Sequence, residues 1–207
     1  MSFNTKGQDL IQIRKTLDLG VQSARIHSIE LKNSKSGKKQ LEFILIGPEM
    51  GDDFEGLPMN REDKEGPKFK GQVAWVRASD WLDSEHYNSS DLKKNGILAR
   101  MNDICKVLGV KDKMDAIDEP TIEEWVAKVH ELVQHDFLYF FLGGEENEYN
   151  EKVTVKKFLP KFNACSMDPA ALPKFNKEDK YHYRKLKTTK EESFETNQQN
   201  TEEEFAV

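Results

Sequence analysis

Hydrophobic and polar positions alternate along the first part of the chain, which is the pattern of half-buried strands. The alternation covers residues 17–32 but changes phase at His27 and Ser28, which predicts a β-bulge there. A polar turn over residues 33–39 precedes a second apolar strand over residues 41–46. These two strands are therefore predicted to form a long hairpin with a basic tip.

A third strand is predicted over residues 68–77, after an acidic loop rich in Gly and Pro over residues 49–68. Alternate positions of this strand form one row, which consists of Phe69, Gly71, Val73, Trp75 and Arg77. Val76 and Ala74 point to the other face. An arginine in line with apolar positions is unusual for a row that only fills a core. For Trp75 two alternatives stay open, namely core packing and stacking on a nucleobase.

The spacing of apolar positions then becomes helical. One helix is predicted over residues 97–108, and Gly109 closes it. A second helix opens at Thr121, where Glu124 completes a capping box. Two helices are thus expected in the middle of the chain.

Two more strands follow, over residues 137–142 and 152–159. The first is apolar on both faces, so we expect it to be central and covered by the helices. The order of elements predicts a mainly β (α+β) fold, a five-stranded oligonucleotide/oligosaccharide-binding (OB) barrel with a two-helix insertion between strands three and four. This domain is predicted to span residues 1–170, followed by a basic linker over 171–190 and a disordered acidic tail over 191–207.

The excess negative charge of the chain lies entirely in that tail. The chain has 37 acids and 31 bases, and six of the acids are glutamates of residues 191–207, where no Lys or Arg occurs. Residues 174–190 carry seven bases and two acids. A neutral body with a basic segment and an acidic arm indicates a binder of polyanions whose own tail competes for the binding groove.

Several classes of protein receive no support from the sequence. No apolar run is long enough for a membrane helix, and the N-terminus does not resemble a signal peptide, so a cytoplasmic protein is expected. Cys105 and Cys165 lie sixty residues apart outside any CxxC motif, so neither a disulfide framework nor a zinc site is expected. Phosphate-binding, nucleophile-elbow and zinc-protease motifs are missing from the sequence, and we expect a protein that is not an enzyme and needs no cofactor or metal.

Cations interleaved with aromatic residues are the strongest functional signal. Binders of single strands need cations for the phosphates and flat side chains on which unpaired bases stack. The predicted nucleic-acid-binding residues come from the hairpin tip, strand three and its exit, and strand five and its exit: Lys35, Lys38, Lys39, Lys68, Lys70, Trp75, Arg77, Trp81, Lys156, Lys157, Phe158 and Lys161.

Each of these residues also has a structural interpretation. Core packing is favoured over base contact for Phe158, whereas Trp81 lies outside the apolar rhythm and favours an exposed role. Tyr181 and Tyr183, within a basic segment, fit a clamp on a nucleic-acid strand and an ordinary charged linker equally well.

The sequence also resembles a known family. The segment GVQSARIHSIELK at residues 20–32, the turn SKSGKKQL at 34–41, the mid-chain helices, the KFLP segment at 157–160 and the acidic tail are together similar to bacteriophage single-stranded DNA-binding proteins of the OB-fold type. The resemblance implies a protein that coats and protects single-stranded DNA during replication, recombination or repair, in the cytoplasm of a host cell.

By the same resemblance, the acidic tail would recruit replication proteins such as a DNA polymerase or helicase. Glu202, Glu203, Glu204 and Phe205 would carry this role, although two further residues, Ala206 and Val207, follow the aromatic one. Self-association into a homo-oligomer is left open, as is the choice between DNA and RNA.

Two other functions compete with this reading. The first is a protein–protein adaptor whose charges only keep it in solution. The second is a metal-dependent nuclease that would use carboxylates of the acidic loop, namely Asp52, Asp53, Asp63 and Glu65.

Overall fold

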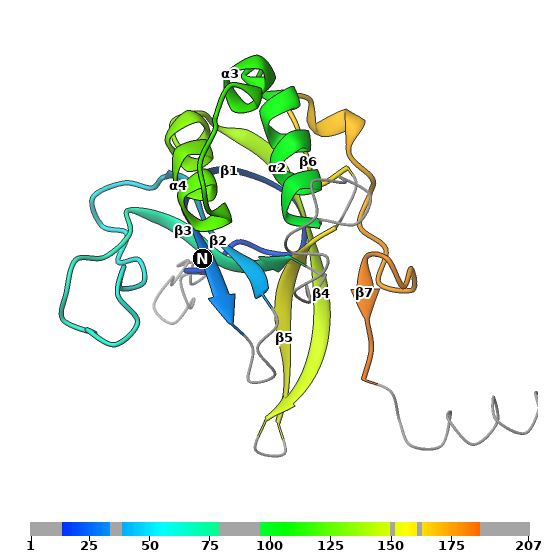
Figure 1. Cartoon of the computed structure of the whole chain (residues 1–207). Helices are drawn as coiled ribbons and strands as arrows, with labels where there is room; N and C mark the ends of the chain where they lie inside the picture. Colours follow the sequence, from blue (N-terminus) through cyan, green and yellow to red (C-terminus); the bar gives the residue numbers. More distant parts are fainter. Residues whose placement is uncertain (1–13, 34–38, 79–95, 150–151, 161–162, 187–207) are drawn as a thin grey trace, which may run out of the picture.

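Five strands pair in a ring in the computed structural model, which describes residues 14–33, 39–78, 96–149, 152–160 and 163–186 (Figure 1). Neighbouring strands are antiparallel except for β3 and β5, which are parallel, and β1 pairs with β4 to close the ring. The predicted OB-type barrel is therefore confirmed. The ring consists of β1 (Gly20–Asn33), β2 (Lys39–Glu49), β3 (Gly71–Ala78), β5 (Lys152–Leu159) and β4 (Leu138–Tyr149).

Strand β1 serves two neighbours because it bends. Its start pairs with β4, from Gly20 opposite Leu142, and its end pairs with β2, up to Asn33 opposite Lys39. The register with β2 shifts between Ile26 and Ser28. The bulge predicted from the change in hydrophobic phase is thus confirmed, and it lets one strand pass from one side of the barrel to the other.

The two faces of the sheet bury different side chains. The inward row of β2, Leu41, Phe43 and Leu45, is fully buried in the main core, together with Ala74 and Val76 of β3. The alternate row of β3 faces outward. Residues of this row pack with neighbours from β2 and from the loop before β3. Together they form a smaller outer cluster of Phe69, Val73, Ile46, Ile44, Leu57 and Trp75. The row that ends in Arg77 therefore lies on the outer surface of the barrel.

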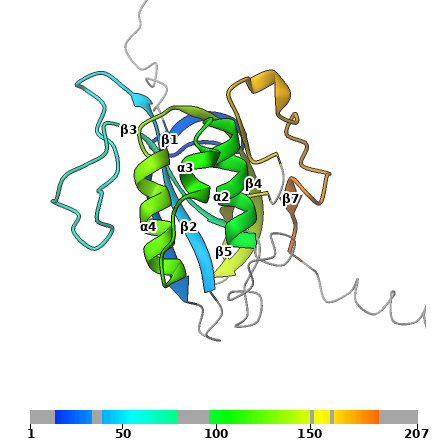
Figure 2. The same ribbon diagram turned by 45° about the horizontal axis from the view of Figure 1, so that its top comes forward.

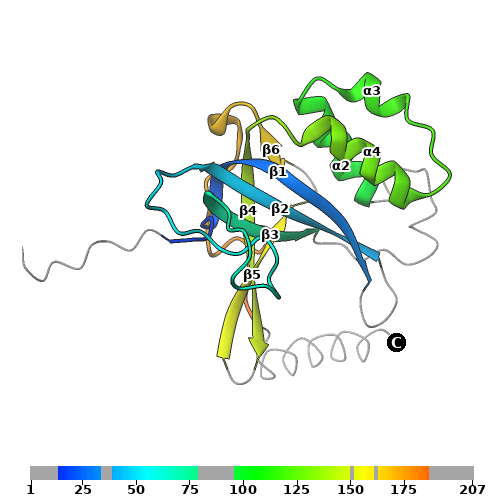
Figure 3. The same cartoon turned by 90° about the vertical axis from the view of Figure 1, so that its left-hand side faces the viewer.

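A helical insertion covers one side of the barrel, away from the end at which the β4–β5 hairpin projects (Figures 1 and 3). Its described helices are α2 (Gly96–Val107), α3 (Lys111–Asp115) and α4 (Ile122–Val133), and Figure 2 shows α2 and α4 over the sheet. The Thr121 hydroxyl oxygen accepts a hydrogen bond from the Glu124 backbone N–H at 3.2 Å, which confirms the N-cap of the predicted capping box, and the same hydroxyl donates to the Glu124 carboxylate at 2.7 Å. The short helix α3 was not predicted, because a five-residue turn that buries only Met114 has no apolar periodicity.

The chain after the barrel continues along the outer side of β4. It adds β6 (Cys165–Ser166), the 3₁₀ turn η1 (Pro169–Ala171) and β7 (Tyr183–Arg184). We call residues 172–186 the C-terminal strap. Its Phe175 and His182 pack on Phe141, with ring centroids 6.3 and 4.7 Å away. The C-terminal strap therefore covers the outer apolar face of β4. The sequence had led us to expect helices on that face.

Candidate nucleic-acid interface

A cleft of about 240 Å³ opens on the outer side of the barrel, where β3 and β5 separate. Among the described residues, the two strands are paired from Val76 opposite Lys157 to Ala78 opposite Leu159. Before this point the N-terminal segment takes the place of β5 beside β3. The Leu17 N–H donates to the Val73 carbonyl and the Val73 N–H donates to the Lys15 carbonyl, both at 3.1 Å.

We call this opening the seam cleft. Four cations line it, and two of them, Arg61 and Arg77, come from the loop before β3 and from β3 itself. The other two are Lys156 and Lys157 of β5, and Glu42 of β2 is the only carboxylate among the described residues that line the cleft. These five side chains have a formal charge of +3, which attracts anions.

An ion pair orients one cation of the seam cleft, and a second cation is partly buried. Arg77 donates from Nε to Oε2 of Glu42 at 3.2 Å, and the Glu42 side chain is only 13% exposed against 43% for Arg77. Burial lowers the pKa of Lys157, and the nearby carboxylate of Asp18 opposes this shift. Partly buried cations that are already oriented lose little freedom when an anion binds.

Trp75 lies at the edge of this cleft, between the outer apolar cluster and solvent. It is partly buried, and its ring meets Phe69 at a centroid distance of 6.4 Å with the planes at 67°. Phe69 in turn contacts the ring of His27 edge to face. The guanidinium of Arg61 lies over the indole, 4.0 Å from its centroid. Trp75 therefore packs on the small outer cluster and also lines a charged cleft, while its stacking on a nucleobase stays a prediction.

A second cleft of about 520 Å³ adjoins the first and shares Trp75 and Arg61 with it. We call it the loop cleft, because residues 56–68 form most of its wall. Lys68 lines it and forms an ion pair with Glu55. The two clefts together bring Lys68, Trp75, Arg77, Lys156 and Lys157 of the predicted set to one side of the barrel.

Other predicted residues lie elsewhere. Lys39 forms an ion pair with Glu123 of α4 at 3.0 Å, and Lys70 is exposed just before β3. Phe158 is only 3% exposed and lies beneath the guanidinium of Arg184, 4.5 Å from its ring centroid. Its ring fills space on the strap side of β5, so it does not line either cleft.

The remaining predicted residues lie outside the described part of the chain. They are Lys35, Lys38, Trp81 and Lys161, and the tail residues Glu202, Glu203, Glu204 and Phe205.

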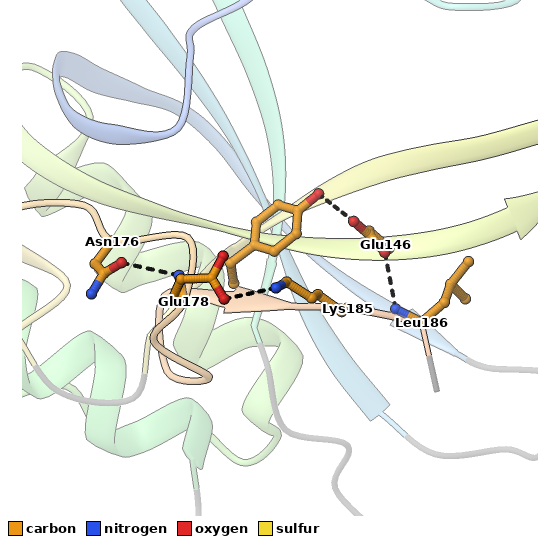
Figure 4. Close-up of polar contacts among 6 residues, drawn as sticks. Glu146, Asn176, Glu178, Lys185 and Leu186 are labelled. Atoms are coloured by element: carbon orange, nitrogen blue, oxygen red, sulfur yellow. Dashed lines mark hydrogen bonds and ion pairs between the residues drawn. The ribbon is translucent and has the colours of Figure 1, made fainter. Parts of the chain in front are cut away.

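The C-terminal strap lies within the segment that the sequence assigned to a basic linker, and polar contacts join it to β4. Tyr183 is buried, and its hydroxyl donates to Glu146 at 2.9 Å, while the Leu186 N–H donates to the other oxygen of the same carboxylate at 3.0 Å (Figure 4). Tyr181, by contrast, is 71% exposed. Of the two tyrosines considered for a clamp, Tyr183 anchors the strap to β4 and Tyr181 faces solvent.

Sequence reasoning missed Arg61 entirely. This residue lies within the acidic loop, apart from any strand or aromatic neighbour in the sequence, so no local pattern marks it. Arg61 reaches Trp75 because the loop folds back over β3, and this contact joins residues that are distant in the sequence.

The carboxylates considered for a nuclease lie in the same loop. The Asp63 side chain accepts a hydrogen bond from the backbone N–H of Glu65 at 3.2 Å. Among residues 14–33, 39–78, 96–149, 152–160 and 163–186, no group of three or more His, Cys, Asp or Glu side chains is arranged to hold a metal ion. In the same ranges no helix is both long and apolar enough to cross a bilayer.

No protein-family model matches the chain, and a search of curated proteins finds no significant match.

Proposed function

We propose that this protein binds single-stranded nucleic acid, with DNA as the first candidate, through the seam and loop clefts. The observation that carries the proposal is the gathering of four cations around Trp75 on the outer side of the β2–β3–β5 sheet. OB barrels bind oligonucleotides on the face of strands two and three, flanked by the β1–β2 and β4–β5 loops. The cleft lies on that face, so the chemistry and the fold point to the same ligand.

The mode of binding follows from the residues of the cleft. Cations bind phosphates whatever the base, and an aromatic or guanidinium plane stacks on every base. We therefore propose a binder with little sequence preference that coats and protects single strands during replication, recombination or repair. The acidic tail, with Glu202, Glu203, Glu204 and Phe205, would recruit partner proteins such as a polymerase or helicase. The proposed function involves no catalysis.

A titration with labelled oligo-dT tests this function. If Arg61, Arg77, Lys156 and Lys157 each neutralise one phosphate, the logarithm of affinity falls with the logarithm of salt concentration with a slope of about −3, since each contact on a single strand contributes about 0.7. Affinity then drops roughly 50-fold between about 50 and 200 mM salt. Tryptophan fluorescence is expected to be quenched in the same titration. No mobility shift and no quenching at low salt would reject nucleic-acid binding.

One observation favours a protein ligand as the second candidate. Val153 and Val155 of β5 are 61% and 43% exposed on the hairpin that projects from the barrel. An adaptor that used them would bind its partner with weak dependence on salt, because apolar contacts release no counterions. The same salt titration therefore separates the two candidates.

A further inference from the structure

Arg61 occupies a turn whose backbone is fixed by hydrogen bonds. The Asp63 N–H donates to the Asn60 carbonyl at 3.2 Å, and the side chain of Asn60 accepts from the Glu62 N–H at 3.0 Å. Further back, the Met59 N–H donates to the Pro67 carbonyl at 2.8 Å. The loop thus returns on itself as a narrow hairpin, and its tip holds Arg61 in a defined place over β3.

The guanidinium of Arg61 covers the ring of Trp75. Its central carbon lies 4.0 Å from the indole centroid, which is the distance of a stacked cation–π contact. A base that stacked directly on this part of the ring would have to displace the guanidinium. Arg61 itself is exposed, and it lines both the seam cleft and the loop cleft. Trp75 lines both clefts too, so a ligand that passes from one cleft to the other meets both side chains, with the guanidinium over one part of the indole.

The charges around Arg61 act in both directions. Burial lowers the pKa of Arg61, Glu42 opposes this shift and Arg77 adds to it. Stacking on Trp75, attraction to Glu42 and the fixed turn hold the guanidinium in place, and displacement of Arg61 would give up these contacts.

We propose that Arg61 and Trp75 together form a platform for base stacking, in which the indole supports the guanidinium from below. A nucleobase stacks on the outer face of the guanidinium, and the N–H groups at the edge of the guanidinium bind a phosphate. A guanidinium has two flat faces and five donors in its plane, so one face can rest on an indole while the other receives a base. This inference rests on the proposed function and names the residue that meets the base. The alternative is a lid, in which Arg61 moves away and the base stacks on Trp75 itself.

Two ligands separate stacking from charge. Labelled oligo-dT offers bases and phosphates, whereas an abasic oligodeoxynucleotide of equal length offers the same phosphates without bases. Arg61→Ala is expected to weaken oligo-dT binding roughly five- to tenfold, because base stacking is lost. On the abasic ligand the loss stays below about threefold, since only one of four cleft cations is removed.

Matched variants isolate the flat face from the charge. Arg61→Lys keeps the charge and the salt slope but is expected to lose nearly as much oligo-dT affinity as Arg61→Ala, because an ammonium has no plane. Lys113→Ala removes an exposed cation of α3 that is not among the described residues lining either cleft, and it should change oligo-dT affinity less than twofold. Arg61→Ala and Trp75→Ala each lower oligo-dT affinity by some factor. The double variant should lose less affinity than the product of these two factors, because both residues belong to one platform.

The variants test the role of Arg61, and the wild-type protein tests nucleic-acid binding itself. Wild-type protein that binds oligo-dT while Arg61→Ala binds it equally well or more tightly would overturn the platform, and tighter binding would indicate the lid. Full affinity in Arg61→Lys would overturn it too, since charge alone would then suffice. Wild-type protein that binds neither ligand would reject the proposed function and the platform together. Thermal melting shows that the Arg61 variants fold, because an exposed loop residue should shift Tm by no more than about 2 °C. Trp75→Ala and the double variant should melt at a lower temperature, since Trp75 packs on the outer cluster, and their affinities are compared well below that transition.

Discussion

Phe158 is the predicted binding residue for which the structure suggests the most specific test. Its side chain is 3% exposed, with the guanidinium of Arg184 over one side of its ring and β4 on the other. On β4 the nearest position is Gly143, where an added Cβ would lie 2.4 Å from the Phe158 Cζ atom. Because Gly143 has no side chain, the ring of Phe158 can occupy the space above it. Phe158 is thus expected to stabilise the fold and to leave nucleic-acid affinity unaffected.

The size of the effect follows from burial. Truncation of a buried Phe to Ala costs about 3–5 kcal/mol, and the lower end applies where the surroundings can settle into the space. The strap that carries Arg184 is such a neighbour, because it is a single chain segment on the barrel surface. We therefore expect a loss of about 3 kcal/mol in Phe158→Ala. For a domain of this size the corresponding fall in Tm is about 6–12 °C.

Thermal melting by circular dichroism measures the stability, and oligo-dT titration well below the melting range measures affinity. The pair with Gly143 sharpens the test. Gly143→Ala alone should destabilise by about 1–3 kcal/mol, because its methyl group overlaps the ring. In the double variant the methyl group enters vacated space, so the two losses should be less than additive by at least about 1 kcal/mol. Intact Tm together with lost oligo-dT affinity in Phe158→Ala would show that the ring serves the ligand and would refute the reasoning.

Three further predictions concern the tail, the thiols and the strap. Deletion of residues 191–207 removes six carboxylates and should raise oligo-dT affinity several-fold at low salt, with the gain fading as salt screens the competitor; equal affinity at low salt would exclude self-competition. Burial raises the pKa of Cys105 to about 11 and that of Cys165 to about 12, so a thiol reagent at mild alkaline pH should react with both only after denaturation, and rapid labelling of native protein would contradict the structure. The hydrogen bond from the Leu186 backbone, followed by that from the Tyr183 hydroxyl, lowers the pKa of Glu146 in the folded protein. Its contribution to stability is therefore fully present above the ordinary glutamate pKa of about 4.3 and is lost as pH falls through the lower folded value, so Glu146→Gln should flatten the dependence of Tm on pH in the acid range, and an unchanged slope would speak against this anchor.

Local patterns were enough to predict most of the barrel. Strand alternation, the phase change at His27 and the capping box at Thr121 each depend on residues that are close in sequence, and the structure contains all three features. The outward direction of the β3 row was harder, because alternation says which side chains share a face but not which face lies inside. Two contacts could not be predicted, the stacking of Arg61 on Trp75 and the hydrogen bond from Tyr183 to Glu146. Each joins a loop or the C-terminal strap to a strand, and no local pattern of the sequence marks it.

The short pairing between β3 and β5 has a consequence for the mechanics of the barrel. Within the part of the chain that the structure describes, these strands share three register pairs, whereas the other neighbours in the ring share between five and eight. Separation at this junction breaks fewer backbone hydrogen bonds than separation anywhere else around the ring, so local opening is expected to begin there. A ligand held at once by Trp75 and Arg77 of β3 and by Lys156 and Lys157 of β5 would tie the two strands together. Occupancy would then slow amide exchange in both strands, and the barrel would be most rigid when it carries its ligand.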